Sequence, residues 1–346
     1  MQMTKEEQYK SRTQKREEVA NDGVERVTLS FYKYVTIADP KSMREELFEK
    51  WYGLGCLGRI YVSHEGINAQ MNVPKENWDE FDSYLQSVSE FSGVPYKIAV
   101  EQDNTSFFKL TIKVKDKIVA DGLDDSSFNP SDTGAYLTAE QMNQYIEDPE
   151  AVVIDMRNAY EAEVGHFESA QVMEVDTFRE QLATVEEQFA EQKDKKIALY
   201  CTGGIRCEKA SAWMKHKGFT DVHHVKGGII DYAHQVKEQG IENKFKGKNF
   251  VFDERMGERV GDEIIATCHL CDKTPADDYH HCKHKPCHVL FIGCQECMKK
   301  KQGYCSGLCV AMDKLPKGIQ KKLARVRAQK PQAASYQKNR MRKKSA

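Results

Sequence analysis

The residues whose types and spacing suggest chemistry lie in the stretch KIALYCTGGIRCEKASAWMKHKGF, positions 196 to 219. An apolar run ends at Cys201, a short loop follows, and an amphipathic helix pattern begins after Cys207. This order predicts a thiol at the tip of a strand, in a loop that leads into a helix N-terminus. Backbone N–H groups of such a loop point at one place and favour negative charge there.

A cysteine in this field has a lowered pKa and exists partly as the reactive thiolate, so we predict that Cys201 is catalytic. The rest of the loop is predicted to bind the substrate or another anion, and it comprises Thr202, Gly203, Gly204, Ile205 and Arg206. Its glycines allow the loop to curl, and its arginine adds positive charge. Cys207 is either a thiol that resolves a persulfide or sulfenate on Cys201, or a small residue at the helix start, which we slightly favour.

Eight further cysteines form four close pairs near the C-terminus: Cys268 and Cys271, Cys282 and Cys287, Cys294 and Cys297, Cys305 and Cys309. Each pair offers two thiolates to one tetrahedral zinc ion, so two four-cysteine zinc sites are predicted. An iron–sulfur cluster is the less favoured alternative. Histidines could replace a spare cysteine, namely His269, His281, His284 and His288. The spacing leaves open which pairs share a metal.

The elements that position these residues begin after a charged stretch, residues 1–23, that we predict to be disordered. Residues 24–122 follow the order β-α-β-β-α-β, which predicts a ferredoxin-like unit of the kind seen in acylphosphatase. Acylphosphatase catalysis is excluded because its arginine-bearing glycine-rich loop is missing near the first strand. His64, Glu65 and Asn68 could contact RNA or close over the thiol loop, but we favour a role as turn residues.

The remaining chain divides into four parts. Residues 123–137 are a predicted linker, rich in Ser, Pro, Gly and Asp. Strand and helix patterns alternate over residues 138–240, which predicts an α/β domain with a parallel sheet and a site at the carboxyl ends of its strands. A cysteine-rich segment (241–312) and a basic tail (313–346) follow. The fold class is therefore multidomain, α/β and α+β.

Composition points to a cytoplasmic protein without a membrane segment, because the 346 residues show no apolar signal region and no long apolar run. Eleven cysteines without an export signal indicate thiol chemistry or metal binding. Residues 310–346 carry twelve Lys or Arg against one acid, which suggests a polyanion partner such as RNA. A solvated, disordered tail is almost equally favoured. No fingerprint of a flavin or nicotinamide cofactor is visible.

The thiol loop resembles that of the rhodanese family, in which the cysteine carries a sulfane sulfur as a persulfide. Protein-tyrosine phosphatase loops place five residues between cysteine and arginine, whereas four stand here. The stretch VVIDMRNAYEAEVGHFESAQVM also resembles rhodaneses, as does HHVKGGIIDY, with its Gly-Gly turn. The matching positions in the first stretch are Asp155, Arg157, Glu161, Gly165, His166 and Ala170. We interpret Asp155, Arg157 and His166 as scaffold. This resemblance implies that residues 138–240 form a rhodanese domain.

Residues 25–312 resemble the bacterial rhodanese-domain tRNA uridine hydroxylases, through GRIYVSHEGINAQM, CTGGIRCEKAS, GKNFVFDERMGERV and the cysteine-rich segment. This resemblance implies tRNA as partner, molecular oxygen as co-substrate, 5-hydroxyuridine at the wobble position as product, and Cys201 as the essential thiol. A protein donor of sulfur or electrons is a further candidate partner. The alternatives are a rhodanese-type sulfurtransferase and, less favoured, a non-enzymatic RNA-binding adaptor.

Overall fold

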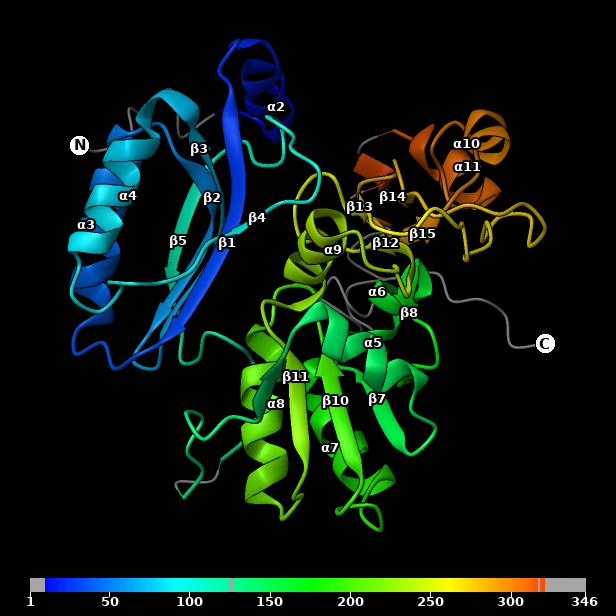
Figure 1. The fold of residues 1–346 in the computed structure, drawn as a ribbon. Coiled ribbons are helices and arrows are strands. Elements are labelled where there is room, and N and C mark those ends of the chain that lie inside the picture. Colours follow the sequence, from blue (N-terminus) through cyan, green and yellow to red (C-terminus); the bar gives the residue numbers. More distant parts are fainter. Residues whose placement is uncertain (1–9, 125–126, 317, 321–346) are drawn as a thin grey trace.

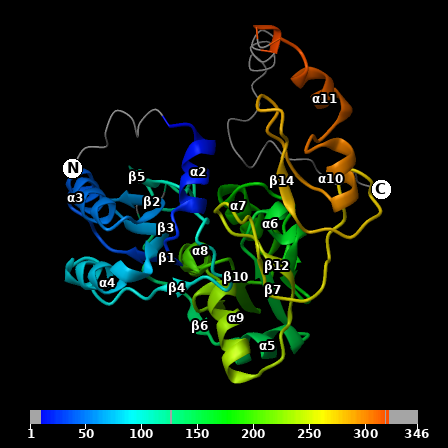
Figure 2. The same cartoon turned by 90° about the horizontal axis from the view of Figure 1, so that it is seen from above.

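The computed structural model describes residues 10–124, 127–316 and 318–320. It has three parts, which we name by their elements: an N-terminal domain (β1 to β5), a central domain (β6 to α9) and a C-terminal segment (β12 to α11). Figure 1 shows α3 and α4 on the outer face of the N-terminal sheet, while the other face is turned toward the rest of the molecule. The view in Figure 2 places β4 on the side of this sheet nearest to α9.

The N-terminal domain confirms the predicted ferredoxin-like order. Its sheet runs β4-β1-β3-β2-β5, and β5 lies parallel to β2 at the edge. Helix α3 begins at Pro40 because the side chain of Asp39 accepts hydrogen bonds from the first free backbone N–H groups. The elements are β1 (Arg26–Tyr34), α3 (Pro40–Gly53), β2 (Leu57–Ser63), β3 (Gly66–Pro74), η1 (Lys75–Asn77), α4 (Trp78–Ser87), β4 (Lys97–Ile98) and β5 (Leu110–Val114).

The two central strands of this sheet are amphipathic. Alternate residues are buried against the helices, among them Leu29 and Phe31 on β1 and the apolar residues of β3. The intervening positions are polar and point to the opposite face, and the strand register pairs them: Thr28 with Asn72, Ser30 with Gln70, and Tyr32 with Asn68. A polar sheet face is therefore presented to the central domain.

The central domain confirms the predicted parallel sheet, with strand order β6-β11-β10-β7-β9. Strand β6 comes from the stretch predicted as linker, and its pairing with β11 adds it to the sheet. Apolar clusters fill both faces of the sheet. The elements are β6 (Ala135–Leu137), α5 (Ala139–Glu147), β7 (Ala151–Asp155), α6 (Ala159–Glu163), β8 (Gly165–Phe167), β9 (Gln171–Val172), α7 (Phe178–Gln188), β10 (Lys196–Tyr200), α8 (Ile205–His216), β11 (Val222–Val225) and α9 (Gly228–Gln239).

The C-terminal segment is joined to the central domain by β12, which pairs antiparallel with β8. The rings of Phe245 and Phe167 meet at this junction, 5.2 Å apart and edge to face. The elements are β12 (Phe245–Asn249), β13 (Glu258–Arg259), β14 (Tyr279–His281), β15 (Leu290–Ile292), α10 (Gln295–Lys301) and α11 (Gly307–Asp313).

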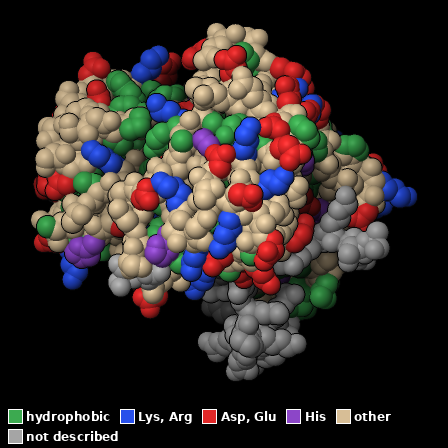
Figure 3. Space-filling view, turned by 60° about the horizontal axis from the view of Figure 1, so that its bottom comes forward, with side chains coloured by type: hydrophobic (Ala, Val, Ile, Leu, Met, Phe, Trp, Pro, Cys, Tyr) green, Lys and Arg blue, Asp and Glu red, His purple; other side chains and the backbone are tan. Residues whose placement is uncertain are grey.

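The predicted disorder of residues 1–23 is wrong where the structure describes them, because helix α2 spans Arg12–Asn21. Ser11 and Gln14 form a capping box at its start, and Arg16 lies 3.3 Å from the carboxylate of Glu254 in the C-terminal segment. Residues 1–9 and most of the predicted basic tail lie outside the described residues. On the face seen in Figure 3, acidic and basic side chains are intermixed. No helix within the described ranges is long and apolar enough to span a membrane.

Candidate active site and metal centres

Cys201 directly follows β10, at the carboxyl end of the central strand of the parallel sheet. The loop then turns sharply into α8, with Gly204 at the helix N-cap in a left-handed conformation, φ 93°. The N–H of Gly204 points back to the sulfur, 3.2 Å from Sγ. The Gly-Gly turn before α9 supports the loop, since the N–H of Ile229 donates to the carbonyl of Cys201. The predicted strand–loop–helix geometry is therefore present.

The electrostatic environment favours the thiolate of Cys201, whose side chain is fully buried. Burial by itself would raise the pKa of this thiol. A hydrogen bond from the Cys207 side chain, the charge of Arg206 and the backbone N–H groups at the helix start outweigh burial and lower the pKa to about 6, against an ordinary value of 9.0. Burial and the neighbouring Cys201 raise the pKa of Cys207 well above its ordinary range, so Cys207 remains a thiol that donates to Cys201.

Arg206 forms a bidentate ion pair with Glu161 of α6, with N–O distances of 2.7 and 2.8 Å. The Glu161 carboxylate is fully buried and the arginine nearly so. This ion pair was absent from the sequence prediction, which assigned the charge of Arg206 to an anionic substrate. Arg206 still lowers the pKa of Cys201, but most of its charge is compensated within the protein.

Asp155 and Arg157 form a second buried pair, 2.7 Å between Oδ2 and Nη2. Arg157 also donates to the carbonyl of Gly165, and the hydroxyl of Tyr200 donates to Asp155. The His166 ring lies 2.9 Å from the carbonyl of the next residue. These contacts hold the loops after β7 and around β8 in place, which agrees with the scaffold role predicted for Asp155, Arg157 and His166.

Cys201 lines a cavity of about 490 Å³ in which the three parts of the chain meet. The central domain contributes the thiol loop and the start of α7, including Phe178. The C-terminal segment contributes Phe252 and Arg255, and the N-terminal domain contributes the polar face of its sheet. A volume of this size lies within the range of about 300–1,000 Å³ that is typical of small-molecule sites. The cavity combines aromatic rings, polar groups and the sulfur of Cys201.

Direct contacts fix the N-terminal domain over the thiol loop. Tyr32 donates to Glu208 on α8, with an O–O distance of 2.9 Å. The buried ammonium of Lys209 lies 2.8 Å from a carboxylate oxygen of Glu65 and 2.7 Å from one of Asp121. The polar sheet face is thereby held against the loop and the helix that follows it.

The turn interpretation favoured for three N-terminal residues needs correction. Asn68 lies within β3, opposite Tyr32, and lines the cavity. Glu65 lies in the turn between β2 and β3, but it also pairs with Lys209 of α8. Only His64, which is exposed and contacts the carbonyl of Ile37, has the contacts of a turn residue alone. The reason is the long β2–β3 hairpin, which extends to the central domain.

Several cavity residues were missed by the sequence analysis, among them Ser30, Tyr32, Gln70 and Lys97. The signal that could have revealed the first two is the alternation in TLSFYKY, where polar residues alternate with Leu29 and Phe31. That alternation shows a polar face but not what the face contacts.

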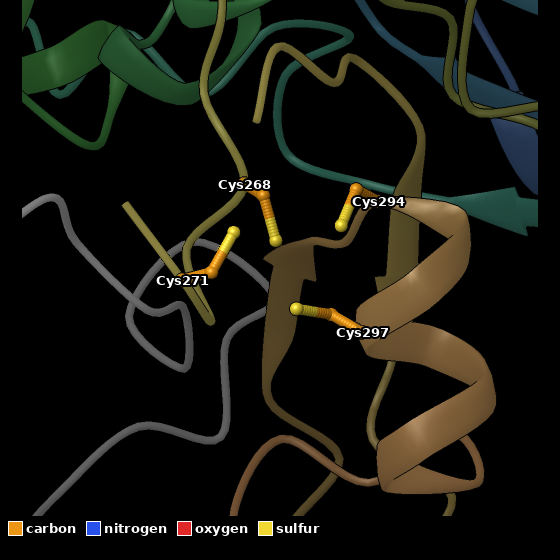
Figure 4. Close-up of side chains that lie close together, drawn as sticks. All are labelled: Cys268, Cys271, Cys294 and Cys297. Atoms are coloured by element: carbon orange, nitrogen blue, oxygen red, sulfur yellow. The ribbon is translucent and has the colours of Figure 1, made fainter. Parts of the chain in front are cut away.

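The eight C-terminal cysteines form two groups, each able to hold a metal ion. Cys268 and Cys271 combine with Cys294 and Cys297, while the second group comprises Cys282, Cys287, Cys305 and Cys309. In Figure 4 the four sulfurs of the first group converge on one point, with Cys294 and Cys297 supplied by the start of α10. Alternate pairs along the chain therefore share a site, a connection that the spacing had left open.

The sulfur spacing fits single metal ions. Within each group all ligand atoms lie within 4.8 Å of one another, and the measured distances from Cys305 to Cys287 and to Cys309 are 3.7 and 3.6 Å. A tetrahedral ion with metal–sulfur bonds of about 2.3 Å places its ligands about 3.8 Å apart. The predicted substitute histidines are not members of either group, and two of them have carboxylate partners: His269 contacts Glu163, and His284 contacts Asp313.

The fold and the site define a rhodanese-like enzyme that carries an acylphosphatase-like domain before it and a cysteine-rich segment after it. Three family models match these parts: the UPF0176 acylphosphatase like domain at residues 26–118, the Rhodanese-like domain at 138–235 and the Rhodanase C-terminal region at 246–310. A solved rhodanese-like domain from Anabaena sp. aligns with 33% of this chain and 80% of its own, at 18% identity and a TM-score of 0.26.

Two relatives at high identity specify the family. The tRNA uridine(34) hydroxylase of Enterobacter sp. (strain 638) is 52% identical over 298 residues, which cover 86% of this chain and 85% of the relative. The protein of the same name from Escherichia coli O9:H4 (strain HS) is 54% identical over 285 residues, 82% of this chain and 81% of the relative. The chain belongs to the tRNA uridine(34) hydroxylase family, as the sequence motifs predicted.

Proposed function

We propose that this protein hydroxylates the wobble uridine of tRNA to 5-hydroxyuridine, with molecular oxygen as co-substrate and Cys201 as the essential thiolate. The observation that carries the proposal is the identity of 52–54% to relatives named tRNA uridine(34) hydroxylase over more than 80% of both chains. A tRNA is then the partner, and the cytoplasm is the place of action.

The cavity supports this proposal because it can hold one nucleotide. Enzymes that act on a base take it from a single strand or turn it out of its stack, and they hold it by stacking and hydrogen bonds. Phe178 and Phe252 offer aromatic surfaces, and Asn68 and Gln70 offer amide groups on the opposite wall. A uridine of the anticodon loop that enters between the domains would meet the thiolate of Cys201.

We further propose that both four-cysteine groups hold zinc. Four thiolates at tetrahedral spacing are the ligand set of structural zinc sites, which leave no open position for a substrate. An iron–sulfur cluster places several irons and inorganic sulfides between its thiolates, so it needs sulfurs further apart than the 3.6 and 3.7 Å found around Cys305. These ions would stabilise the C-terminal segment and take no part in oxygen chemistry.

Nucleoside mass spectrometry of total tRNA tests the hydroxylase proposal. A strain without the gene is compared with strains that carry the intact gene, the Cys201→Ser variant or the Cys56→Ala variant. Cys56 is a matched control, because it is also a buried thiol but burial raises its pKa to about 12. We expect 5-hydroxyuridine with the intact gene and the control only. Product formation by Cys201→Ser would refute the role of the thiol.

The same purified proteins test the alternative, a sulfurtransferase. A thiolate in a cradle of N–H groups can also carry a persulfide, so sulfur transfer from thiosulfate to cyanide is measured in parallel. Rapid transfer by the intact protein, together with tRNA that contains no 5-hydroxyuridine in any strain, would replace the hydroxylase by the sulfurtransferase.

A further inference from the structure

One positive charge in the cavity has no ion-pair partner among the residues that the structure describes. Lys97 of β4 lines the cavity and is only 4% exposed. Within the described part of the chain its ammonium forms neither a hydrogen bond nor an ion pair, and it lies over the ring of Tyr32, 4.4 Å from the ring centroid. A buried charge without a partner is costly, so such a group is expected where a ligand completes its contacts.

The strand register places Lys97 directly against the thiol loop. Lys97 pairs with Ser30 across β4 and β1, and Ser30 pairs with Gln70 across β1 and β3. The three side chains therefore form a row on the polar face of the sheet. A side chain built at Gly203 would lie 3.7 Å from Cδ of Lys97 and 3.9 Å from Oγ of Ser30, so this row faces the loop.

Lys97 supplies a positive charge that the thiol loop itself lacks. Arg206 is committed to Glu161 by two short hydrogen bonds, so its charge is largely compensated. Burial lowers the pKa of Lys97, while the charges of Asp231, Glu208 and Cys201 act in the opposite direction from a distance. Glu208 accepts hydrogen bonds from Tyr32 and Tyr136 instead of pairing with the lysine. The ammonium thus remains directed at the cavity.

We propose that Lys97 is a catalytic residue that donates a hydrogen bond to a carbonyl oxygen of the target uracil and stabilises the negative charge that develops there. This inference rests on the proposed hydroxylase function. It assigns the base rather than a phosphate, because Lys97 lies directly against the thiol loop at Gly203 and is almost fully buried. The phosphates belong to a continuous polynucleotide and must remain near the entrance.

The step that this charge serves is the addition of the thiolate to the ring. The sulfur of Cys201 forms a bond to C6, the electron pair of the C5–C6 π bond forms a π bond between C4 and C5, and the pair of the C4–O4 π bond moves onto O4. The resulting oxyanion accepts the hydrogen bond of Lys97, and C5 becomes electron-rich, as hydroxylation at C5 requires. No oxidant takes part in this addition, and loss of the thiolate reverses it. Hydrogen-bond donors aimed at a developing oxyanion contribute strongly to catalysis.

The test compares Lys97→Met, which keeps the length of the side chain, with Lys97→Arg and with Lys113→Met. Lys113 is the matched control, an exposed lysine on β5 of the same sheet. We expect Lys97→Met to lower the single-turnover rate by about 100-fold, the effect of one lost oxyanion donor, with unchanged tRNA affinity. Lys97→Arg should recover part of the rate, and Lys113→Met should behave as the parent protein.

Two further measurements separate catalysis from structure. The melting temperature of Lys97→Met should stay the same or rise, because a buried charge without a partner is removed, whereas loss of a structural contact would lower it. A tRNA that carries 5-fluorouridine at the wobble position should form a covalent adduct with Cys201 without oxygen, because fluorine activates C6 toward the thiolate and a proton from solvent then adds to C5; Lys97→Met should form this adduct more slowly. Failure of the parent protein to form this adduct would overturn the addition step.

The remaining outcomes are also decisive. An unchanged rate in Lys97→Met would overturn the proposal. So would a loss of tRNA affinity at an unchanged rate, with a weaker dependence on salt, because that pattern belongs to a phosphate contact. If the parent protein yields no 5-hydroxyuridine at all, the hydroxylase proposal itself fails. That result is distinguishable from a failure of the Lys97 proposal, in which the parent protein is active and Lys97→Met is equally fast.

Discussion

The thiol of Cys207 is predicted to keep Cys201 ionised, and the Cys207→Ala substitution tests this. With a pKa of about 6, Cys201 is about 90% thiolate at pH 7, whereas a thiol with its ordinary value of 9.0 would be about 1% thiolate. A hydrogen bond to a charged group contributes about 1.5–3 kcal/mol, and 1.36 kcal/mol corresponds to one pKa unit. Because S–H is a weak donor, we take the lower limit and expect the pKa of Cys201 to rise to about 7.

The assay is the rate at which iodoacetamide alkylates Cys201, followed by mass spectrometry of its peptide over a range of pH. The parent protein should react with a midpoint near pH 6, and Cys207→Ala with a midpoint about one unit higher. The Cys56→Ala protein serves as the control and should keep the parent midpoint. A midpoint in Cys207→Ala that equals or falls below that of the parent would refute the role of Cys207 as donor.

Three other predictions concern stability and metal. The folded-state pKa of Cys201 lies below its unfolded value, so the thiolate stabilises the fold above about pH 9, and this contribution is lost as the pH falls toward 6. The free energies of unfolding of the parent and of Cys201→Ser, measured in urea, should therefore differ by up to about 4 kcal/mol less at pH 6 than at pH 9. Lys209→Met should lower the free energy of unfolding by about 1–3 kcal/mol, because buried Asp121 loses one of its two lysine partners; an unchanged value in urea unfolding would contradict the ion-pair argument. Native mass spectrometry should find two metal ions per chain, and one in either Cys268→Ser or Cys282→Ser; loss of both ions in each variant would contradict two independent groups.

The local structure around Cys201 could be predicted from the sequence because it depends on short-range patterns. An apolar strand, a glycine-containing loop and an amphipathic helix define the position of the thiol without knowledge of the rest of the fold. The same holds for the ferredoxin-like order, since each helix and strand has its own periodicity. Helix α2 could also have been predicted, because Ser11 and Gln14 carry the capping-box signature. The high charge of the stretch led to the prediction of disorder instead.

Contacts between residues far apart in the chain could not be predicted from the sequence. The partner of Arg206 stands 45 residues earlier, and nothing in the local pattern distinguishes Glu161 from the other acids of that region. Lys97 lies on a strand of two residues, and its side-chain direction follows only from the register with Ser30. Which cysteines share a metal could not be predicted for the same reason, because it depends on backbone hydrogen bonds between distant segments, from His269 to Ile292 and from Lys283 to Gly303.

The two flanking parts act on the thiol loop from opposite sides. In the C-terminal segment, His269 contacts Glu163 at 2.7 Å, and Tyr279 donates to the carbonyl of Tyr160. Both partners belong to α6, the short helix that also carries Glu161. Because Glu161 orients Arg206, a cysteine cluster that never touches the cavity can still control the environment of the sulfur.

The N-terminal domain adds what the loop lacks. In the thiol loop itself the main cation, Arg206, is paired with Glu161. The polar sheet face closes the site and brings Lys97 to it, and the ion pairs of Lys209 hold this face in position. Substrates are then restricted to those that can enter between the domains and place a hydrogen-bond acceptor opposite Gly203. A pyrimidine base on a flexible loop meets both conditions.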